Sequence, residues 1–128
     1  MKYLGIDYGS KRVGLAVSDE SGNMSFPLVV INNTEKLINE ILDICDQKKV
    51  DEIVVGESKG FKMNDNEIMK GIAVLVEDLK KRTDRPIHMH PEFLTSVEAE
   101  QIQGKNDMLD ASAAAIILKS FLDTKNNF

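Results

Sequence analysis

The chain contains 128 residues, of which 42% are hydrophobic and 29% are charged, and its formal net charge is −5. This length and composition are typical of one globular domain with a core of its own. The acidic balance argues against a protein that coats nucleic acid through bulk positive charge, although it permits a local basic rim around an acidic centre. No apolar run approaches the ~20 residues of a membrane span, and the N-terminus leads directly into a predicted strand, so we expect a cytoplasmic protein with no membrane partner.

The first third of the chain predicts a three-stranded antiparallel meander. Runs of apolar and β-branched residues indicate strands over residues 2–7, 13–19 and 26–31. Glycine-bearing turns separate these strands. Pro27 lies near the start of the third one, where a missing N–H group is tolerated.

Helices and strands alternate in the next part of the chain. Asn33 or Thr34 is expected to cap a helix that has Glu35 in its first turn and an apolar stripe ending at Cys45. The elements expected after it are a strand over 52–56, a loop over 57–66, a helix with apolar residues from 68 to 79, and a strand over 87–90.

The last part of the chain predicts two helices. Thr95 and Glu98 belong to a capping box that opens a short helix, which Gly104 ends. The final helix is expected from about 108 to 123, with its inward residues at Leu109, Ala113, Ile116, Ile117 and Phe121. The order βββαβαβαα predicts an α/β fold with a mixed five-stranded sheet and helices on both faces. We expect the first three strands to be antiparallel and the fourth and fifth to be parallel.

Cys45 is the only cysteine in the sequence, which excludes an internal disulfide and a thiolate-cluster metal site. Because it shares a helical face with Leu37 and Ile41, we interpret it as a core residue. A metal ion must then be bound by oxygen ligands or by His88 and His90. These two histidines alternate along the fifth strand and are interpreted as a pair on the sheet surface, with a phosphate-contacting role for His90 as the alternative.

Acidic residues lie where several predicted elements begin or end. Asp7 is placed inside an apolar strand pattern, where an uncompensated charge is costly. Glu57 follows the fourth strand and Glu92 follows the fifth. Asp107 and Asp110 stand one helical turn apart at the start of the last helix. Because sites in an open sheet gather at the carboxyl ends of its strands, we expect these acids to converge.

Converging carboxylates form an oxygen-rich site, which favours Mg²⁺ or Mn²⁺. Two such ions about 3.5–4 Å apart can activate a water and stabilise the leaving oxygen in phosphodiester cleavage. The sequence has no Walker-type phosphate loop and no Gly-x-Gly-x-x-Gly pattern. Structural interpretations stay open for the individual acids, with Asp107 as a helix N-cap and Glu57 and Glu92 as solvated loop residues.

Basic residues lie near the predicted acidic centre. Lys11 and Arg12 occupy the tip of the first hairpin, close to the acid of the first strand. They are either exposed turn cations or contacts for substrate phosphates, for which the geometry of arginine is well suited. Lys59 and Lys62 in the loop after the fourth strand, and Lys105 before the last helix, would extend this basic rim.

Four motifs of the chain resemble one known family. They are GIDYGSKRVGLAVSD at 5–19, IVVG at 53–56, LTSVEAE at 94–100 and LDASAAAIIL at 109–118. Together they resemble the YqgF/RuvX family of ribonuclease H-like proteins, to which pre-16S rRNA nuclease activity is attributed. The resemblance spans almost the whole chain and implies one ribonuclease H-like nuclease domain over 1–128. It also implies metal-dependent hydrolysis of RNA in maturation of the 16S rRNA 5′ end, with Asp7, Glu92 and Asp110 as metal-binding catalytic acids.

Two positions depart from the family's usual pattern. The family carries Leu-Pro after the glycine of the fourth strand, where this chain has Glu57 and Ser58. It carries Asp-Glu-Arg before the LTS motif, where this chain has Pro91, Glu92 and Phe93. Glu92 therefore keeps the acid of the family's Asp-Glu-Arg segment, whereas the aspartate before it and the arginine after it are absent.

The position of Glu57, at the end of the fourth strand, is instead similar to that of an acid in the related RuvC-type Holliday junction resolvases. The spacing of Asp107 and Asp110 also resembles that of the RuvC-type resolvases. The sequence therefore leaves open a second acid set, consisting of Asp7, Glu57 and Asp110 with Glu92 or Asp107 as the fourth member. All these acids are retained as candidate metal ligands.

Three functions are consistent with these residues. The preferred one is a nuclease that acts on an rRNA precursor. The alternative is a resolvase of four-way DNA junctions, which would require a dimer that presents two sites. A non-catalytic nucleic-acid-binding module is the third. In each case the expected partner is nucleic acid, and the chain is expected to be a monomer or a homodimer.

Overall fold

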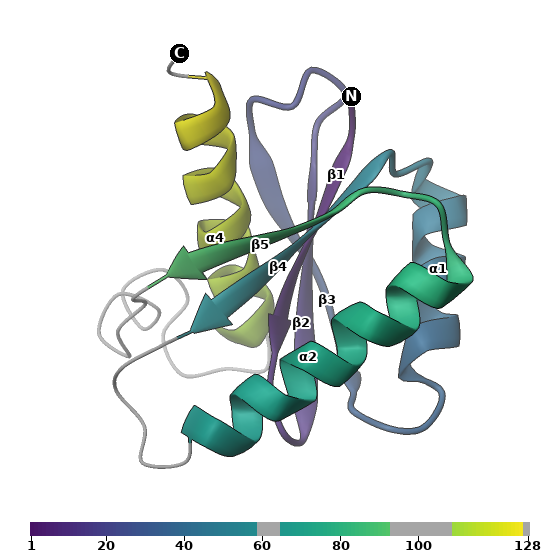
Figure 1. The fold of residues 1–128 in the computed structure, drawn as a ribbon. Helices are drawn as coiled ribbons and strands as arrows, with labels where there is room; N and C mark the ends of the chain where they lie inside the picture. The colour runs from purple at the N-terminus through teal and green to yellow at the C-terminus, as the bar shows by residue number, and fades with distance from the viewer. Residues whose placement is uncertain (59–64, 93–108, 127–128) are drawn as a thin grey trace.

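The structure is a computed structural model that describes residues 1–58, 65–92 and 109–126 (Figure 1). In chain order its elements are β1 Tyr3–Tyr8, β2 Arg12–Ser18, β3 Ser25–Asn32, α1 Leu37–Lys48, β4 Glu52–Ser58, α2 Asp65–Arg82, β5 Ile87–Glu92 and α4 Leu109–Asn126. No helix among the described residues is long and apolar enough to cross a bilayer.

The five strands form one sheet with the order β3-β2-β1-β4-β5. The pairs β1–β2 and β2–β3 are antiparallel, whereas β4 is parallel to β1 and β5 is parallel to β4. This arrangement confirms the mixed sheet predicted from the sequence. Because β1, β4 and β5 run in the same direction, their last residues lie along one edge of the sheet, which we call the carboxyl edge.

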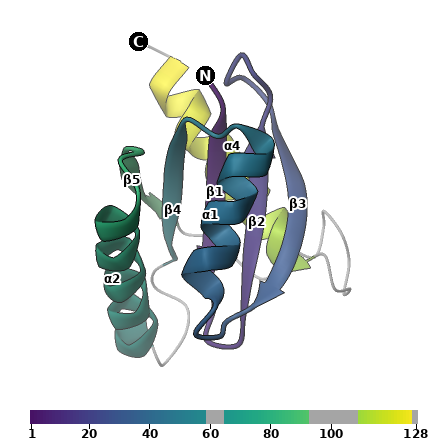
Figure 2. The same cartoon turned by 90° about the vertical axis from the view of Figure 1, so that its right-hand side faces the viewer.

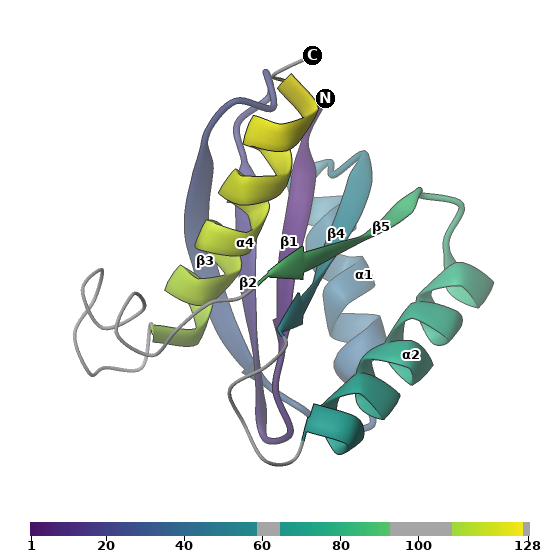
Figure 3. The same cartoon turned by 60° about the vertical axis from the view of Figure 1, so that its left-hand side comes forward.

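Helices cover both faces of the sheet, as predicted. Helices α1 and α2 pack on one face (Figure 2), and α4 packs on the other (Figure 3). Leu4 and Ile6 of β1 belong to the core under α1 and α2, whereas Tyr3 belongs to the core under α4. Successive residues of a strand face opposite sides. The pleat therefore assigns Gly5 and Asp7 to the face that α4 covers.

Helix α4 approaches the sheet so closely that it requires glycine on two strands. A Cβ atom at Gly5 would lie 2.8 Å from the Leu118 Cβ and 3.1 Å from the Ala114 carbonyl oxygen. A Cβ atom at Gly56 of β4 would lie 2.5 Å from the Ile117 Cδ1. These contacts fix the helix against the central strand and its neighbour.

The burial of α4 differs in part from the predicted stripe. Ala113 and Ile117 are buried as predicted, whereas Ile116 and Phe121 are only partly buried. The α4 residues with no exposed surface are Ala111, Ser112, Ala114, Ile117, Leu118 and Leu122. The difference arises because the helix turns its alanine-rich side toward Gly5, a contact between distant segments that helical periodicity alone does not reveal.

Two strands extend further than predicted. Strand β4 continues through Ser58 and β5 through Glu92, so the backbones of Glu57 and Glu92 belong to strands and not to loops. The fifth strand was predicted to end at His90, so Pro91 lies inside the observed strand. It is accommodated because β5 lies at the edge of the sheet, where a missing ladder hydrogen bond is tolerated.

The start of α1 also differs from the prediction. The helix begins at Leu37 with Lys36 at the N-cap, so neither Asn33 nor Thr34 is the cap residue and Glu35 precedes the first turn. The Thr34 hydroxyl still accepts a hydrogen bond from the Lys36 N–H at 3.2 Å. Asn33 is not available for capping because its side chain bonds to the first hairpin, as described below.

Cys45 is fully buried, as predicted. Burial raises the pKa of its thiol from 9.0 to about 11. Because the folded state keeps this proton to a higher pH than the unfolded state, the associated stability is present below pH 9 and is lost as the pH rises toward 11.

We expect a thiol-specific reagent at pH 8 to label Cys45 in the native protein more than about 100-fold more slowly than in the urea-unfolded protein, measured by absorbance. Equal labelling rates would contradict the buried position.

Candidate active site

Asp7 lies in the central strand at the carboxyl edge and is half-buried. On one side it is paired with Gly14 of β2. On the other side the last paired residues are Ile6 and Val55 of β4, so Gly56 is the next β4 residue beside Asp7. The ladders on both sides therefore fix the backbone that carries this acid.

The first turn of α4 lies at the same edge of the sheet. Tyr3, at the beginning of β1, contacts Lys125 and Phe121 near the end of α4. Farther along β1, Gly5 contacts Ala114 and Leu118. The helix therefore runs antiparallel to β1, and the backbone of Asp110, one turn before Ala114, lies toward the carboxyl edge.

The structure thus places the backbones of four predicted acids toward one edge of the sheet, namely Asp7, Glu57, Glu92 and Asp110. Among the side chains that the structure describes, no group of three or more His, Cys, Asp or Glu residues could hold a metal ion. Other parts of the prediction lie outside the described residues: Lys59, Lys62, the helix over 95–104, Lys105, Asp107, and the side chains of Glu57, Glu92, Leu109 and Asp110. The metal ligand set stays a prediction.

Lys11 and Arg12 lie at the first hairpin, and both are exposed. Two hydrogen bonds from Asn33 hold this hairpin from the side of the β3–α1 connection. The sequence pattern predicted only a helix-capping role for Asn33. An asparagine four residues before a helix could be recognised in the sequence. Its hydrogen-bond partners, Gly9 and Lys11, could not, because they lie more than 20 residues earlier in the chain.

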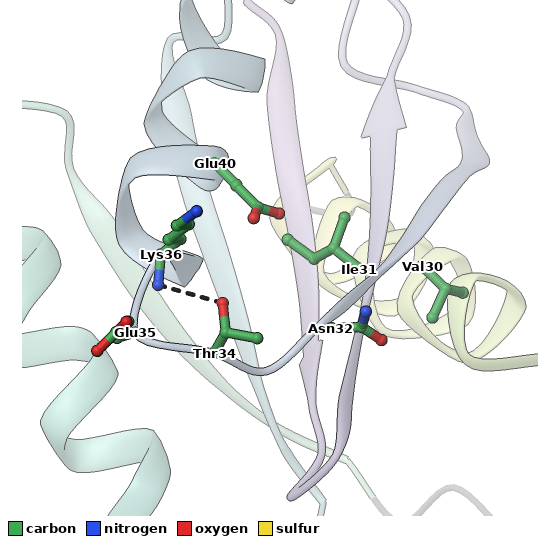
Figure 4. Close-up of a pocket in the computed structure, with 7 residues that line it drawn as sticks. All are labelled: Val30, Ile31, Asn32, Thr34, Glu35, Lys36 and Glu40. Atoms are coloured by element: carbon green, nitrogen blue, oxygen red, sulfur yellow. Dashed lines mark hydrogen bonds between the residues drawn. The ribbon is translucent and has the colours of Figure 1, made fainter.

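A shallow pocket of about 530 Å³ adjoins this connection (Figure 4). Its lining residues are Val30, Ile31, Asn32, Thr34, Glu35, Lys36 and Glu40. Asn32 is the register partner of Arg12. The pocket therefore lies beside the exposed basic hairpin, although its own lining carries two carboxylates and one ammonium group.

His88 and His90 lie on the α4 face of the edge strand β5, in agreement with their interpretation as a sheet-surface pair. The His88 Nε2 lies 2.5 Å from the Glu52 Oε1, and the His90 Nε2 lies 3.0 Å from the Ser120 Oγ. Both rings also contact the ring of Phe121, with centroid distances of 5.1 and 5.9 Å. These contacts attach β5 to α4.

Replacing Gly5 by Ala is expected to lower the free energy of unfolding by about 1–3 kcal/mol, because the added methyl group overlaps the Leu118 Cβ and the Ala114 carbonyl. Urea unfolding measures this change. Gly71→Ala is the matched control. There the nearest atoms belong to the far end of the Tyr8 side chain and not to backbone, and alanine favours the helix. A smaller loss for Gly5→Ala than for Gly71→Ala would contradict the close packing of α4.

The solved structures with a similar arrangement include two proteins in complex with Holliday junction DNA. The chain is similar to Thermus thermophilus RuvC in complex with a Holliday junction substrate, with a TM-score of 0.66, 15% identity, and coverage of 99% of this chain and 97% of that one. It is also similar to the Fowlpox virus resolvase in complex with Holliday junction DNA, with a TM-score of 0.56, 11% identity, and coverage of 99% and 100%. At these identities the likeness shows the fold alone, which is that of the ribonuclease H-like resolvases.

The family follows from the sequence comparisons. The model of the RuvX family, described as Holliday junction resolvase, matches residues 1–124, so the chain belongs to the RuvX family. A relative in Nitratidesulfovibrio vulgaris, named a putative pre-16S rRNA nuclease, is 37% identical over 96% of this chain and 94% of its own length. A relative of the same name in Maridesulfovibrio salexigens is 35% identical over 95% of this chain and 98% of its own length. The family is a nuclease family, and this chain is a hydrolase of that class.

Nucleases with this fold generally use divalent metal ions. The candidate ligands at the carboxyl edge fit such an ion because all of them are carboxylates, the oxygen donors that Mg²⁺ and Mn²⁺ prefer. Cys45 lies in the core under α1 and α2, the layer opposite the α4 face to which the pleat assigns Asp7. The chemistry of the residues at this edge is therefore compatible with the metal-dependent activity of the family.

Proposed function

We propose that this chain is a metal-dependent nuclease that acts on an RNA precursor in the maturation of the 5′ end of pre-16S rRNA. The observation that carries the proposal is the position of Asp7, at the end of the central strand and on the face that α4 covers. Relatives that match nearly the whole chain carry the name of this activity. The proposal implies a cytoplasmic protein whose partner is ribosomal precursor RNA.

The proposed catalytic acids are Asp7, Glu57, Glu92 and Asp110, with Asp107 as a further metal ligand. They would hold two Mg²⁺ or Mn²⁺ ions. When bound, such ions supply an activated water and stabilise the leaving oxygen. The protein itself contributes a fixed carboxylate on β1, because the ladders on both sides prevent that strand from shifting.

The proposed substrate contacts are Lys11, Arg12, Lys59 and Lys62. The first two are exposed on the hairpin that directly follows β1. Cations in this place can bind phosphate oxygens beside the reacting group, and a guanidinium can do so with two hydrogen bonds. Such contacts orient the nucleic acid without reading its sequence.

Resolution of four-way DNA junctions is the second candidate function. The description of the RuvX family and the similarity to the RuvC fold favour it. This function would require a homodimer with two sites, because a junction is resolved by two cuts.

Cleavage assays with two substrates test the proposal. The purified chain is mixed with Mn²⁺ and either a 5′-extended 16S precursor RNA or a synthetic four-way junction. We expect the precursor to be shortened at its 5′ end and the junction to stay intact. Cuts at paired symmetric positions of the junction, with intact precursor, would establish the resolvase instead. Absence of both cleavage and Mn²⁺ binding by calorimetry would identify a non-catalytic binding module.

A further inference from the structure

The β3–α1 connection is hydrogen bonded to the turn between β1 and β2. The Asn33 backbone N–H donates to the Lys11 carbonyl oxygen at 2.9 Å. The Asn33 side-chain Nδ2 donates to the Gly9 carbonyl oxygen at 2.8 Å. One residue therefore binds the hairpin on both sides of its tip, and the segments it joins are 24 positions apart in sequence.

The turn itself is tightly closed. A Cβ atom at Gly9 would lie 2.5 Å from the Arg12 carbonyl oxygen, so the backbone on the two sides of the turn is in close contact. Ser10, Lys11 and Arg12 are all exposed, so the turn presents much of its side-chain surface to solvent. The hydrogen bonds from Asn33 are external contacts that fix where this exposed turn points.

The local role expected of Asn33 is absent. The N-cap of α1 is Lys36, three residues later, and its N–H is bound by the Thr34 hydroxyl. The Asn33 side chain is half-buried and directed away from the helix, toward Gly9. Its amide therefore serves the hairpin and not the helix.

We propose that Asn33 is a positioning residue for substrate binding, which holds the hairpin so that Lys11 and Arg12 face the nucleic acid. This inference rests on the proposed nuclease function. A basic turn that is already ordered loses less conformational entropy when it binds a phosphate chain than a loose one does. Asn33 therefore strengthens binding without contacting the substrate.

The inference predicts an effect on binding and little effect on turnover. Asp7 lies before the turn and is held by its pairing with Gly14, not by Asn33. Loss of the Asn33 side chain should therefore raise KM and leave kcat within about twofold. The affected contacts hold the bound substrate and the transition state equally strongly.

Binding is measured in the Asp7→Asn background, so that the RNA is not cut. The probe is the 5′-extended 16S precursor RNA, titrated by fluorescence anisotropy at several salt concentrations. We expect Asn33→Ala to weaken binding about threefold to tenfold, the effect of losing one hydrogen bond that orders the contact. Asn33→Asp has the same size but no side-chain donor, and it adds a negative charge beside the hairpin, so it should weaken binding at least as much. The exposed neighbour provides the control, because Asn32→Ala should change the affinity by less than about twofold.

A double substitution distinguishes positioning from a general structural role. If Asn33 acts through Lys11 and Arg12, then Asn33→Ala should add less than about twofold to the loss caused by removing both cations in Lys11→Ala/Arg12→Ala. It should also reduce the slope of log affinity against log salt, because fewer phosphates are neutralised. Hydrogen exchange of the amides at 10–13 should become faster, with thermal unfolding close to that of the parent.

Three results would overturn the inference. Affinity within twofold of the parent for both Asn33 variants would show that the hydrogen bonds do not serve binding. Full additivity with Lys11→Ala/Arg12→Ala would show that Asn33 acts elsewhere. A folded parent that binds no precursor RNA would show that the proposed function has failed, and with it the inference. Should Asn33→Ala unfold, Asn33→Asp supplies the same comparison.

Discussion

Replacing Asp7 by Asn is expected to lower the rate of precursor cleavage by more than about 100-fold, because a carboxylate that directly holds a metal ion contributes at least as much as the groups around it. The amide keeps the size of the side chain but removes the charge that balances a divalent ion. On the two strands beside Asp7, the neighbouring residues are Gly14 of β2 and Gly56 of β4, neither of which can replace the lost carboxylate.

Cleavage of the 5′-extended precursor in Mn²⁺ measures this loss, and calorimetry should show that the Mn²⁺ binding heat is reduced at the same time. The matched control is Asp43→Asn, the same chemical change at an exposed position of α1. It should leave both measurements unchanged. Full activity in the Asp7 variant would assign the cleavage to a contaminant or to a different centre.

The sequence was sufficient for the overall fold because its signals are local. The runs of apolar and β-branched residues in the first three strands, the β-branched run at 53–55 and the helical stripe through Cys45 each act over a few residues. Each corresponds to the element expected from it. Element ends were less well predicted. Strand β5 continues past Pro91 because it is an edge strand, and strand order is a property of the whole sheet.

The parts of the candidate site that the sequence did not predict depend on contacts between distant segments. Asn33 has the residue type and position of a helix cap, yet its side chain bonds to Gly9. The buried stripe of α4 was predicted only in part, because the closest contacts of that helix are with glycines on two strands. Asp7, by contrast, could be identified from the sequence, because a carboxylate in an apolar strand is unusual wherever the strand lies.

The register of the sheet bears on which acid is the principal partner of Asp7. The β4 residue beside Asp7 is Gly56, and its contact with Ile117 places it on the α4 face. Glu57 is one residue further and shares the parity of Val55, which is buried in the core under α1 and α2. Strand β4 therefore has no acid at the position that faces α4 beside Asp7.

Strand β5 has an acid, Glu92, at a position with the parity of the α4 face. His90 pairs with Gly56 and contacts Ser120 of α4, so its position belongs to the α4 face. Position 92 is the next one with the same parity. Position 92 is two residues beyond His90, which lies level with Asp7 across Gly56. Two strand spacings of about 4.8 Å and a rise of about 6.6 Å separate the two backbones by about 12 Å. Two carboxylates and a pair of ions about 3.5–4 Å apart can bridge this span.

We therefore expect Glu92→Gln to lower precursor cleavage by more than about 100-fold and Glu57→Gln to lower it by less than about tenfold. The two variants make the same chemical change at the ends of adjacent strands, so each serves as the control for the other. Mn²⁺ calorimetry should show a reduced binding heat for Glu92→Gln alone. The reverse order of effects would assign the partner role to Glu57, as in the acid set that is similar to the RuvC-type resolvases. Pleat alternation and the close approach of α4 favour Glu92, because only its position has the parity that Asp7 and Gly56 share.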